Sequence, residues 1–538
     1  MVQLRSLMVG ALLATAPIAL PAQPQQLPHL IHSGGRHALI VDGAPFLILG
    51  GQANNSSNYP AVLPQVWPTI RALHANTLEI PVAWEQIEPV EGRFDFSWLD
   101  TLIPQARANG VRLDLLWFGT WKNTGPSYEP EWVKSDTKRF PRMMTKDGKT
   151  HYVPTPLSRA TLEADKRAFV ALMRHIREID AAHTVILVQV ENEVGSYGNP
   201  RDFSPQANRL FAQAIPAELA RKIGKSGTWT QVFDWNADTA FNAWHTARYI
   251  DEIAAAGQAE LNLPMYVNVV VGNPFDAKAG GGASGGADWP VLDVWKAAAP
   301  HIAMAAPDLY DRDYRTVNGK LDRMARPDNP LFVPENGNDL PFARFFWLAL
   351  GKGAIGWAPF GMDPTYFNYP LGGKDLGPEN LDAFASKYAL LQPMARDWAR
   401  LAFEHPTVGF AKPEDASDQS APMGRWKITA QYGLWTFGDP TWTWMKTPPN
   451  PKKDQPIGGA ALIQLGPDEF LLAGSDLRIG FALATPMPGD NVHFLDVEEG
   501  TFDNGRWVMA RRWNGDQTDY GLNLTTPVLL KVRLGTYR

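Results

Sequence analysis

The chain has 538 residues, 45% of them hydrophobic, with a formal net charge of −6 and no cysteine. The apolar fraction is large enough for an extensive core, which excludes wholesale disorder, and the length allows about three domains or one large barrel with a companion. The mild acidity argues against a nucleic-acid partner, and the lack of cysteine excludes disulfides, thiolate nucleophiles and cysteine-based metal sites.

The N-terminus has the pattern of an export signal. Arg5 precedes an apolar run over residues 7–20, and a polar stretch follows. The run has the length of a signal-peptide core and is too short to predict a membrane span. We therefore expect residues 1–22 to be a signal peptide and the protein to be exported to a bacterial periplasm, without membrane association after cleavage. An amphipathic N-terminal segment is the alternative.

Residues 27–400 alternate between short apolar runs and helical patterns, after a hairpin signal at Asp42-Gly43. Eight such units favour a closed (β/α)₈ barrel with a parallel sheet. An open doubly wound sheet would need a phosphate-binding glycine turn after its first strand, and residues 50–55 do not match one. The expected strands are residues 46–50, 77–82, 111–117, 185–190, 265–271, 302–306, 331–333 and 354–358, and the clearest helices are 99–108, 160–179, 239–256 and 340–350.

Two of the connections are long, residues 122–152 and 197–226. In a barrel such loops lie at the catalytic face and shape its opening. The glycine-rich residues 280–286 contain a Gly-x-Gly-x-x-Gly and, around Ser284, a Gly-x-Ser-x-Gly. Neither has the strand–turn–helix context that phosphate binding or a nucleophile elbow requires. We interpret this segment as a mobile rim.

The pattern changes beyond about residue 401. Residues 404–423 are rich in Pro, Asp and Ser, which indicates a linker. Short alternating runs with Gly, Asp and Asn turns follow, and they predict a C-terminal β-sandwich domain over residues 424–538.

Two glutamates directly follow apolar strands, Glu193 after the fourth and Glu335 after the seventh. The carboxyl ends of all barrel strands surround one opening, so these side chains can meet there. Glycoside hydrolysis needs such a pair, one carboxylic acid to protonate the leaving oxygen and one carboxylate to attack. A structural ion pair is the alternative for either residue alone. Glu191 leaves the strand first, and we assign it to packing rather than to acid catalysis.

The motifs around these residues resemble known enzymes. The segment Gln189-Val190-Glu191-Asn192-Glu193-Val194-Gly195 resembles the acid/base signature of glycoside hydrolase family 35 β-galactosidases, and Asn before the acid/base Glu marks the wider clan of retaining (β/α)₈ glycosidases. Residues 84–96, WEQIEPVEGRFDF, resemble the second-strand motif shared by families 35 and 42. The likeness covers residues 30 to 395, and the tail resembles the β-sandwich of a bacterial branch of these enzymes.

The resemblance implies that Glu193 is the general acid/base, Glu335 is the nucleophile and Asn192 holds the 2-hydroxyl of the sugar. Three motif positions depart from the family. Pro81 replaces a Tyr, Ile87 replaces a His, and residues 119–121, Gly-Thr-Trp, replace Ala-Glu-Trp, so a Glu that holds the sugar is absent. Galactose recognition has therefore moved to other residues, or another sugar is recognised.

Sugar sites combine aromatic stacking surfaces with a few polar groups. At the predicted strand ends we expect Tyr310 to orient the nucleophile, and Trp121 and Trp357 to be better stacking candidates than the other tryptophans. No metal or cofactor motif is present, so we expect neither. The full set of substrate-binding candidates is Asn192, Asn54, Glu85, Trp84, Trp117, Trp121, Lys122, Tyr310 and Trp357, with Asn55 and Asp308 as further polar groups.

The sequence thus predicts a retaining exo-β-galactosidase that acts on a carbohydrate partner. The bacterial branch it resembles includes enzymes that trim galactose from xyloglucan side chains, so plant cell-wall oligosaccharides are the expected substrates. The alternatives are another β-glycosidase of the clan (arabinopyranosidase, fucosidase, glucosidase or mannosidase) and a glycan-binding barrel without catalysis. Retention of both glutamates argues against the last.

Overall fold

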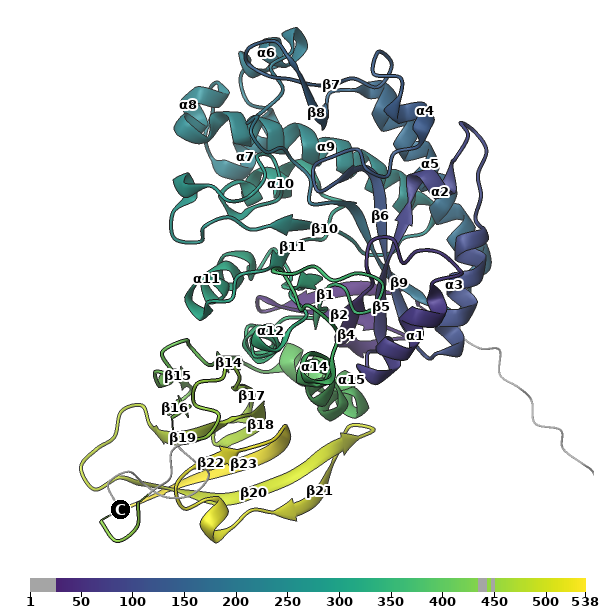
Figure 1. Ribbon diagram of the computed structural model, residues 1–538. Helices are drawn as coiled ribbons and strands as arrows, with labels where there is room; N and C mark the ends of the chain where they lie inside the picture. Colours follow the sequence, from purple (N-terminus) through teal and green to yellow (C-terminus); the bar gives the residue numbers. More distant parts are fainter. Residues whose placement is uncertain (1–25, 434–442, 447–449) are drawn as a thin grey trace, which may run out of the picture.

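The computed structural model describes residues 26–433, 443–446 and 450–538. The expected signal peptide, residues 1–22, lies outside the described residues. Within the described part of the chain, no helix combines the length and the apolar character needed to cross a membrane. The described residues form an α/β barrel followed by a strand-rich C-terminal domain (Figure 1).

Eight parallel strands form the barrel sheet in the order β12-β11-β10-β9-β6-β5-β4-β13. Backbone hydrogen bonds between Val333 and the Gly356–Trp357 strand close the ring between its two ends. All eight strands expected from the sequence are present, which confirms the predicted barrel. In chain order they are β4 (Ile48–Gln52), β5 (Thr77–Ala83), β6 (Arg112–Lys122), β9 (Val185–Asn192), β10 (Met265–Val270), β11 (Met304–Leu309), β12 (Glu335–Asn336) and β13 (Gly356–Trp357).

A helix follows each strand and covers the outside of the sheet (Figure 1). The longest predicted helix, α5, shows why these segments fold this way. Ser158 caps its N-terminus through the Thr161 amide, and Phe169, Met173 and Ile176 form an apolar stripe that is fully buried. The helices are α1 (Leu63–Ala72), α3 (Ser97–Ala108), α5 (Arg159–Ile179), α9 (Ala237–Glu260), α10 (Leu292–Ala298), α11 (Tyr314–Met324), α13 (Phe345–Gly351) and α14 (Pro378–Leu391).

The N-terminal end of the barrel is closed by a small antiparallel sheet, which contains the predicted hairpin at Asp42-Gly43. Its strands are β1 (His29–Ser33), β2 (Arg36–Val41) and β3 (Ala44–Phe46). Leu39 and Val41 belong to one buried cluster with Met304 and Phe332 of the barrel. Because this end is filled by apolar side chains, a binding site can lie only at the opposite, carboxyl end of the strands.

The two long connections carry their own elements. The first contains α4 (Glu131–Lys134), β7 (Arg142–Met144) and β8 (Thr150–Pro154), and the second contains α6 (Pro205–Phe211), α7 (Ala217–Ile223) and α8 (Trp229–Phe233). The glycine-rich segment that we expected to be a mobile rim is anchored. Ser284 exchanges two backbone hydrogen bonds with Ser196, and its hydroxyl donates to the Pro200 carbonyl, so it is not a free nucleophile.

The C-terminal domain has two antiparallel sheets, as predicted, with an apolar core between them. The expected linker is wrong in part, because residues 407–411 and 419–423 are strands of this domain, which therefore begins before residue 424. Both segments pair with later strands. Gly and Pro interrupt the alternation of apolar and polar residues in them, so the sequence pattern did not indicate strands. One sheet contains β14 (Thr407–Ala411), β17 (Gly459–Gly466), β18 (Glu469–Ser475), β23 (Val528–Tyr537), β20 (Asn491–Asp503) and β21 (Arg506–Arg512); the other contains β15 (Gln419–Met423), β16 (Trp426–Gln431), β19 (Leu477–Leu483) and β22 (Leu522–Leu524).

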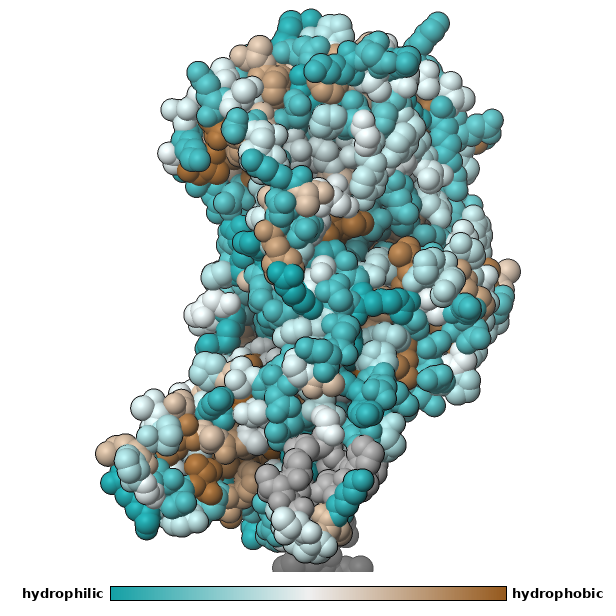
Figure 2. All heavy atoms as spheres, turned by 60° about the vertical axis from the view of Figure 1, so that its left-hand side comes forward, coloured by the Kyte–Doolittle hydropathy of each residue, from teal (hydrophilic) through white to brown (hydrophobic). Residues whose placement is uncertain are grey.

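The two domains approach each other most closely where two glycines meet. A Cβ on Gly351, the last residue of α13, would lie 1.9 Å from the Gly409 nitrogen in β14. No larger residue fits at this position, so helix and strand are in backbone contact. The exposed surface of the barrel is mostly hydrophilic, whereas hydrophobic side chains gather over the C-terminal domain (Figure 2).

Candidate active site

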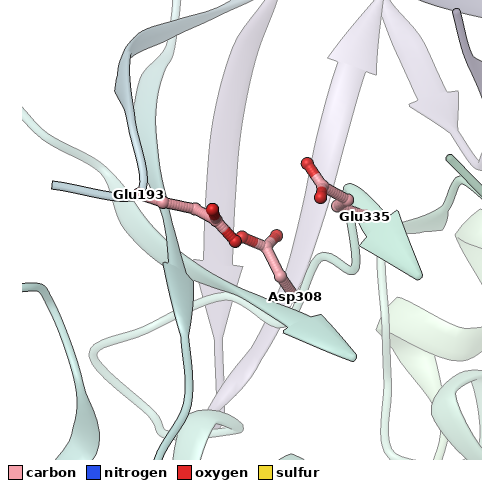
Figure 3. A group of neighbouring side chains, drawn as sticks. All are labelled: Glu193, Asp308 and Glu335. Atoms are coloured by element: carbon pink, nitrogen blue, oxygen red, sulfur yellow. The ribbon is translucent and has the colours of Figure 1, made fainter. Parts of the chain in front are cut away.

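Three carboxylates converge at the carboxyl end of the barrel strands (Figure 3). Glu193 follows β9, Asp308 lies in β11 and Glu335 begins β12. One carboxylate oxygen from each residue lies within 4.8 Å of those of the other two. The structure therefore brings together the two glutamates predicted from the sequence, and it adds Asp308 between them.

The spacing of the two glutamates distinguishes the two stereochemical classes of glycosidase. Retaining enzymes hold their carboxylates about 5–5.5 Å apart, whereas inverting enzymes leave about 6.5–9.5 Å for a water molecule. One oxygen of Glu193 and one of Glu335 lie within 4.8 Å of each other, so the two carboxyl groups face the same small space.

Glu335 is held by two donors. The Tyr310 hydroxyl donates to Oε1 at 2.6 Å, and Gln52 Nε2 donates to Oε2 at 3.3 Å. The side chain is only 6% exposed, so its orientation is fixed by these contacts. The predicted contact between Tyr310 and the candidate nucleophile is present, and Gln52 was not foreseen.

Glu193 has a different environment. It is partly exposed, and its backbone amide donates to Asn268 Oδ1 at 2.9 Å. Burial and the negative charge of Glu335 raise the pKa of Glu193 to about 7, against a lowering by the Lys122 ammonium. A carboxyl group with this pKa can both give and take a proton near neutral pH, as a general acid/base must.

Asp308 lies between the two glutamates and is 2% exposed. Its Oδ2 accepts from Asn268 Nδ2 at 2.9 Å, and its side chain is hydrogen-bonded to Glu193. Two carboxyl groups can share a hydrogen bond only when one of them is protonated. Burial raises the pKa of Asp308 well above its ordinary value and helps to raise that of Glu193 to about 7, so both groups hold a proton more readily than free carboxyl groups do.

Asn192 and Lys122 form the neighbouring wall. Lys122 Nζ donates to Asn192 Oδ1 at 2.8 Å and to Asn123 Oδ1 at 2.6 Å. The Nδ2 of Asn192 is buried and has no hydrogen-bond partner among the described residues. A buried unsatisfied donor is costly in a protein interior, so this group is available to an oxygen of a ligand.

Glu191 points away from the site. Its carboxylate accepts from the Trp121 amide at 2.7 Å and the Thr120 amide at 3.2 Å, and it lies beside Asp165 of α5. The packing role expected for Glu191 thus matches its position. Thr120, which replaces the sugar-holding Glu of the family, donates its hydroxyl to Asp165 at 2.6 Å and likewise faces outward.

Trp84 and Trp117 lie outside the candidate site and do not offer their rings to a ligand. Trp84 donates to Glu88 at 3.0 Å, and Trp117 donates to Asp165 at 2.9 Å. Both residues are completely buried, so the prediction that they bind sugar is wrong. Side chains alternate along a strand, and Trp117 in β6 projects toward α5 rather than into the barrel, whereas Trp84 is the first residue of the short helix α2 (Trp84–Ile87).

Trp121 and Trp357, the preferred stacking candidates, are also wrong as binding residues. Trp121 is 1% exposed and packs edge-on against Tyr249 of α9. Trp357 is completely buried in β13. A Cβ built on the neighbouring Gly356 would meet interior side chains of the barrel, Ile48 and Phe332, so alternation turns Trp357 outward.

Two polar candidates serve the scaffold instead. Asn54 is 3% exposed, and its amide group donates twice to Asp363, which joins the loops after β4 and β13. Glu85 forms an ion pair with Lys134 at 2.9 Å, with both side chains more than a third exposed. Neither residue contacts the three carboxylates, because the turn that follows each strand directs its side chain toward Asp363 or Lys134 instead.

Sequence reasoning also missed Asn268 and Tyr197. Asn268 is a polar residue inside the apolar strand β10, and that interruption was the available signal. Tyr197 is 44% exposed at the opening of the site, and burial together with the charge of Glu193 raises its pKa to about 12. Its position in a long insertion gave no pattern that could have singled it out.

The three carboxylates are also the group of described residues whose oxygens lie close enough to hold a metal ion. Hard cations prefer six or more oxygen ligands, and here the Lys122 ammonium already lies close enough to affect Glu193 and Asp308. These side chains are therefore better suited to proton transfer than to holding a metal ion.

Comparisons with known proteins agree with this geometry. Residues 65–256 match the family model described as beta-galactosidase, and residues 384–525 match a domain of unknown function, DUF5597. A beta-galactosidase of Xanthomonas manihotis is 27% identical over 222 residues, 39% of this chain and 34% of that protein. The human beta-galactosidase-1-like protein 3 is 26% identical over 197 residues, 34% of this chain and 27% of that protein. The chain thus covers about a third or less of the length of these curated relatives.

One solved structure supports the fold alone. The beta-galactosidase from Bacillus circulans sp. alkalophilus aligns with a TM-score of 0.51 and 10% identity, over 91% of this chain and 99% of that one. The sequence matches and the barrel together support a glycosidase of the TIM-barrel clan. Within that class, the matched barrel model and the curated relatives are β-galactosidases.

Proposed function

We propose that this protein is a retaining exo-β-galactosidase that removes terminal β-D-galactose from plant cell-wall oligosaccharides such as xyloglucan side chains. The observation that carries the proposal is the pair Glu193 and Glu335, with carboxylate oxygens within 4.8 Å and different surroundings. The matches to β-galactosidases support the sugar, and the expected export of the chain places the reaction in a bacterial periplasm.

In the first step the Glu335 carboxylate attacks C1 of the galactoside. The bond between C1 and the leaving oxygen breaks, and that oxygen takes the proton of Glu193. The two donors on Glu335, Tyr310 and Gln52, hold the attacking carboxylate in place. The unpaired Nδ2 of Asn192 is the group that meets the 2-hydroxyl of the sugar, where hydrogen bonds strengthen in the transition state.

In the second step the galactosyl ester of Glu335 is hydrolysed. Ester formation removes the negative charge that helps to raise the pKa of Glu193, so this pKa falls and Glu193 is held in the carboxylate form that can accept a proton from water. Glu193 takes a proton from water, whose oxygen attacks C1. The ester bond breaks, galactose leaves with its configuration retained, and both glutamates return to their starting states.

A second candidate is another β-glycosidase of the same clan, and one observation favours it. The family Glu that holds the sugar is replaced by Thr120, whose hydroxyl is bonded to Asp165 away from the site. Lys122 is the polar group of the same loop that does reach the site. The side chains available to contact the hydroxyl groups of the sugar therefore differ, and this difference favours a sugar other than galactose.

The deciding experiment measures monosaccharide release from galactosylated xyloglucan oligosaccharides and from an aryl β-galactoside, with the anomer followed by NMR. We expect β-galactose from both substrates. Release from the aryl substrate alone would reject the natural substrate and keep the mechanism. Release of α-galactose first would reject retention, and no galactose from either substrate would reject the β-galactosidase assignment.

A further inference from the structure

A cavity of about 620 Å³ opens between the loops that follow β10 and β11. Its lining includes Phe275 from the first loop, and Asp313, Arg315 and Thr316 from the second loop and the start of α11. The volume lies within the range of about 300–1,000 Å³ that ligand pockets occupy. The reaction as described above uses none of these four residues.

The cavity is continuous with the catalytic carboxylates. Asp308 and Tyr310 both line it. Asp308 is hydrogen-bonded to Glu193, and the Tyr310 hydroxyl is 2.6 Å from Glu335 Oε1. One lining residue thus contacts the candidate acid, and another contacts the candidate nucleophile. A ligand in this cavity would lie against the reaction centre.

The order of strands defines which side of the reaction centre the cavity occupies. Glu193 follows β9, and Glu335 is in β12. Around the ring, β10 and β11 lie between these two strands on one side, and β6, β5, β4 and β13 lie between them on the other. Lys122 from β6, which donates to the proposed sugar-binding residue Asn192, and Gln52 from β4, which donates to Glu335, lie on the second side. The cavity lies on the first side, where a leaving group has room away from these contacts.

The lining also indicates what kind of leaving group fits. Phe275 is 50% exposed and rests on Gly319, with the Arg315 guanidinium 4.3 Å from its ring centre. An exposed ring beside hydrogen-bonding groups is the usual surface for a pyranose. The lining carries both signs of charge, three aspartates against Arg315 and Lys320, and Asp311 pairs with Lys320 at 2.5 Å. Such a lining selects hydroxyl groups rather than a net charge.

We infer that this cavity is the leaving-group subsite and that it binds the neutral sugar residues of an oligosaccharide aglycone. The inference rests on the proposed function, because it assigns the leaving-group part of the same active site. It predicts that the enzyme recognises the sugar beyond the scissile bond, mainly through Phe275 and Arg315.

The test compares two substrates with the same galactose and different leaving groups. One is a galactosylated xyloglucan oligosaccharide, and the other is β-D-galactosyl fluoride, whose leaving group cannot fill the cavity. We expect Phe275→Ala and Arg315→Gln each to lower kcat/KM for the oligosaccharide about 10-fold or more, as loss of one good contact does, and to change the fluoride reaction less than about two-fold. Tyr537→Ala, an aromatic of similar exposure (53%) on the C-terminal domain, should change neither.

Equal losses on both substrates, or no loss on the oligosaccharide, would overturn the inference. If the unaltered enzyme releases galactose from neither substrate, the proposed function fails instead. A second measurement does not depend on turnover of the oligosaccharide. The degalactosylated oligosaccharide should inhibit hydrolysis of galactosyl fluoride, and Phe275→Ala should weaken that inhibition. Unchanged inhibition in this variant would also reject the assignment, as would stronger inhibition by an anionic oligosaccharide than by the neutral one.

Discussion

Glu191 and Glu193 are separated by one residue and have opposite surroundings. Glu191 is fully buried, accepts two backbone amides and lies beside Asp165, outside the barrel. Glu193 is partly exposed and faces Asp308 and Glu335. Burial raises the pKa of both, that of Glu191 well above its ordinary value and that of Glu193 to about 7. A raised pKa therefore does not distinguish catalysis from packing here, whereas access to the cavity and the partners of the carboxylate do.

The backbone explains how two nearby glutamates reach opposite sides of the sheet. Both have positive φ, 67° at Glu191 and 44° at Glu193, a region that side chains with a Cβ seldom adopt. The surrounding hydrogen bonds hold this conformation, including the one from the Glu193 amide to Asn268. Strain at the carboxyl end of β9 is thus shared by Glu191 and by the residue proposed to transfer protons, Glu193, and such strain is common at functional sites.

The largest effect is expected at the nucleophile. Glu335→Gln removes the attacking charge and keeps the shape, so kcat should fall by at least about 10³-fold while the circular dichroism spectrum is unchanged. The measurement is galactose release at saturating aryl galactoside. A variant that keeps more than a tenth of the activity would show that Glu335 is not the nucleophile.

The same substitution at the two neighbouring glutamates tests the comparison directly. Glu193→Gln removes the acid, and kcat/KM on the oligosaccharide should fall about 10²–10⁴-fold, with a smaller loss on galactosyl fluoride, whose leaving group needs no proton. Glu191→Gln keeps an acceptor for one of the two amides and should lower the thermal stability, while kcat/KM should stay within about five-fold of the unaltered enzyme. Equal losses in both variants would remove the distinction between them.

Asp308 should give an intermediate effect that depends on hydrogen bonding. Asp308→Ala removes the hydrogen-bond partner of Glu193, so kcat should fall about 10-fold or more. Because that hydrogen bond lowers the pKa of Glu193, the decline of kcat/KM at high pH should move to higher pH. Asp308→Asn keeps a donor and should restore most of the rate and the original profile. If Asn and Ala variants behave alike, Asp308 has only a space-filling role.

The smallest effect concerns Lys122 and the pH profile. The acid form of Glu193 is required, so kcat/KM of the unaltered enzyme should decline as pH rises through about 7. Lys122 lowers the pKa of Glu193, and Lys122→Met should therefore shift this decline to higher pH, with a loss of about five-fold at pH 6 from the lost contact with Asn192. A shift to lower pH would contradict the assignment of the acid.

The sequence predicted the groups that directly follow strands, and it did not predict the direction of side chains next to irregular strand ends. Glu193, Glu335, Asn192 and Lys122 are where the barrel pattern placed them. Trp121 failed because alternation breaks near the end of β6, where the pairing with β9 is irregular between Trp117 and Lys122. This irregularity turns Trp121 outward and lets Lys122 enter the site, and no propensity in the sequence encodes it.

Other parts of the site depend on contacts between distant strands. Gln52 reaches Glu335 only because the ring closes, and Asn268 became interpretable only once β10 was seen to lie between β9 and β11. The C-terminal sandwich was predicted from alternation, but its first strand, β14, was missed because its pairing partner β17 lies about 50 residues later in the chain, and β15 was missed although its partner β16 follows directly. Apart from β15, long-range pairing rather than local preference defined these features.

The contact between Gly351 and Gly409 has a consequence for how the chain unfolds. α13 follows the strand that carries Glu335, and β14 is an edge strand of the C-terminal sheet, so the backbone of one domain supports the other at the last residue of this helix, beside the N-terminal hairpin of the barrel. Neither domain can open without exposing the buried face of its neighbour. The two should therefore melt in a single cooperative transition, and the C-terminal domain is a structural requirement of the barrel rather than a removable appendage.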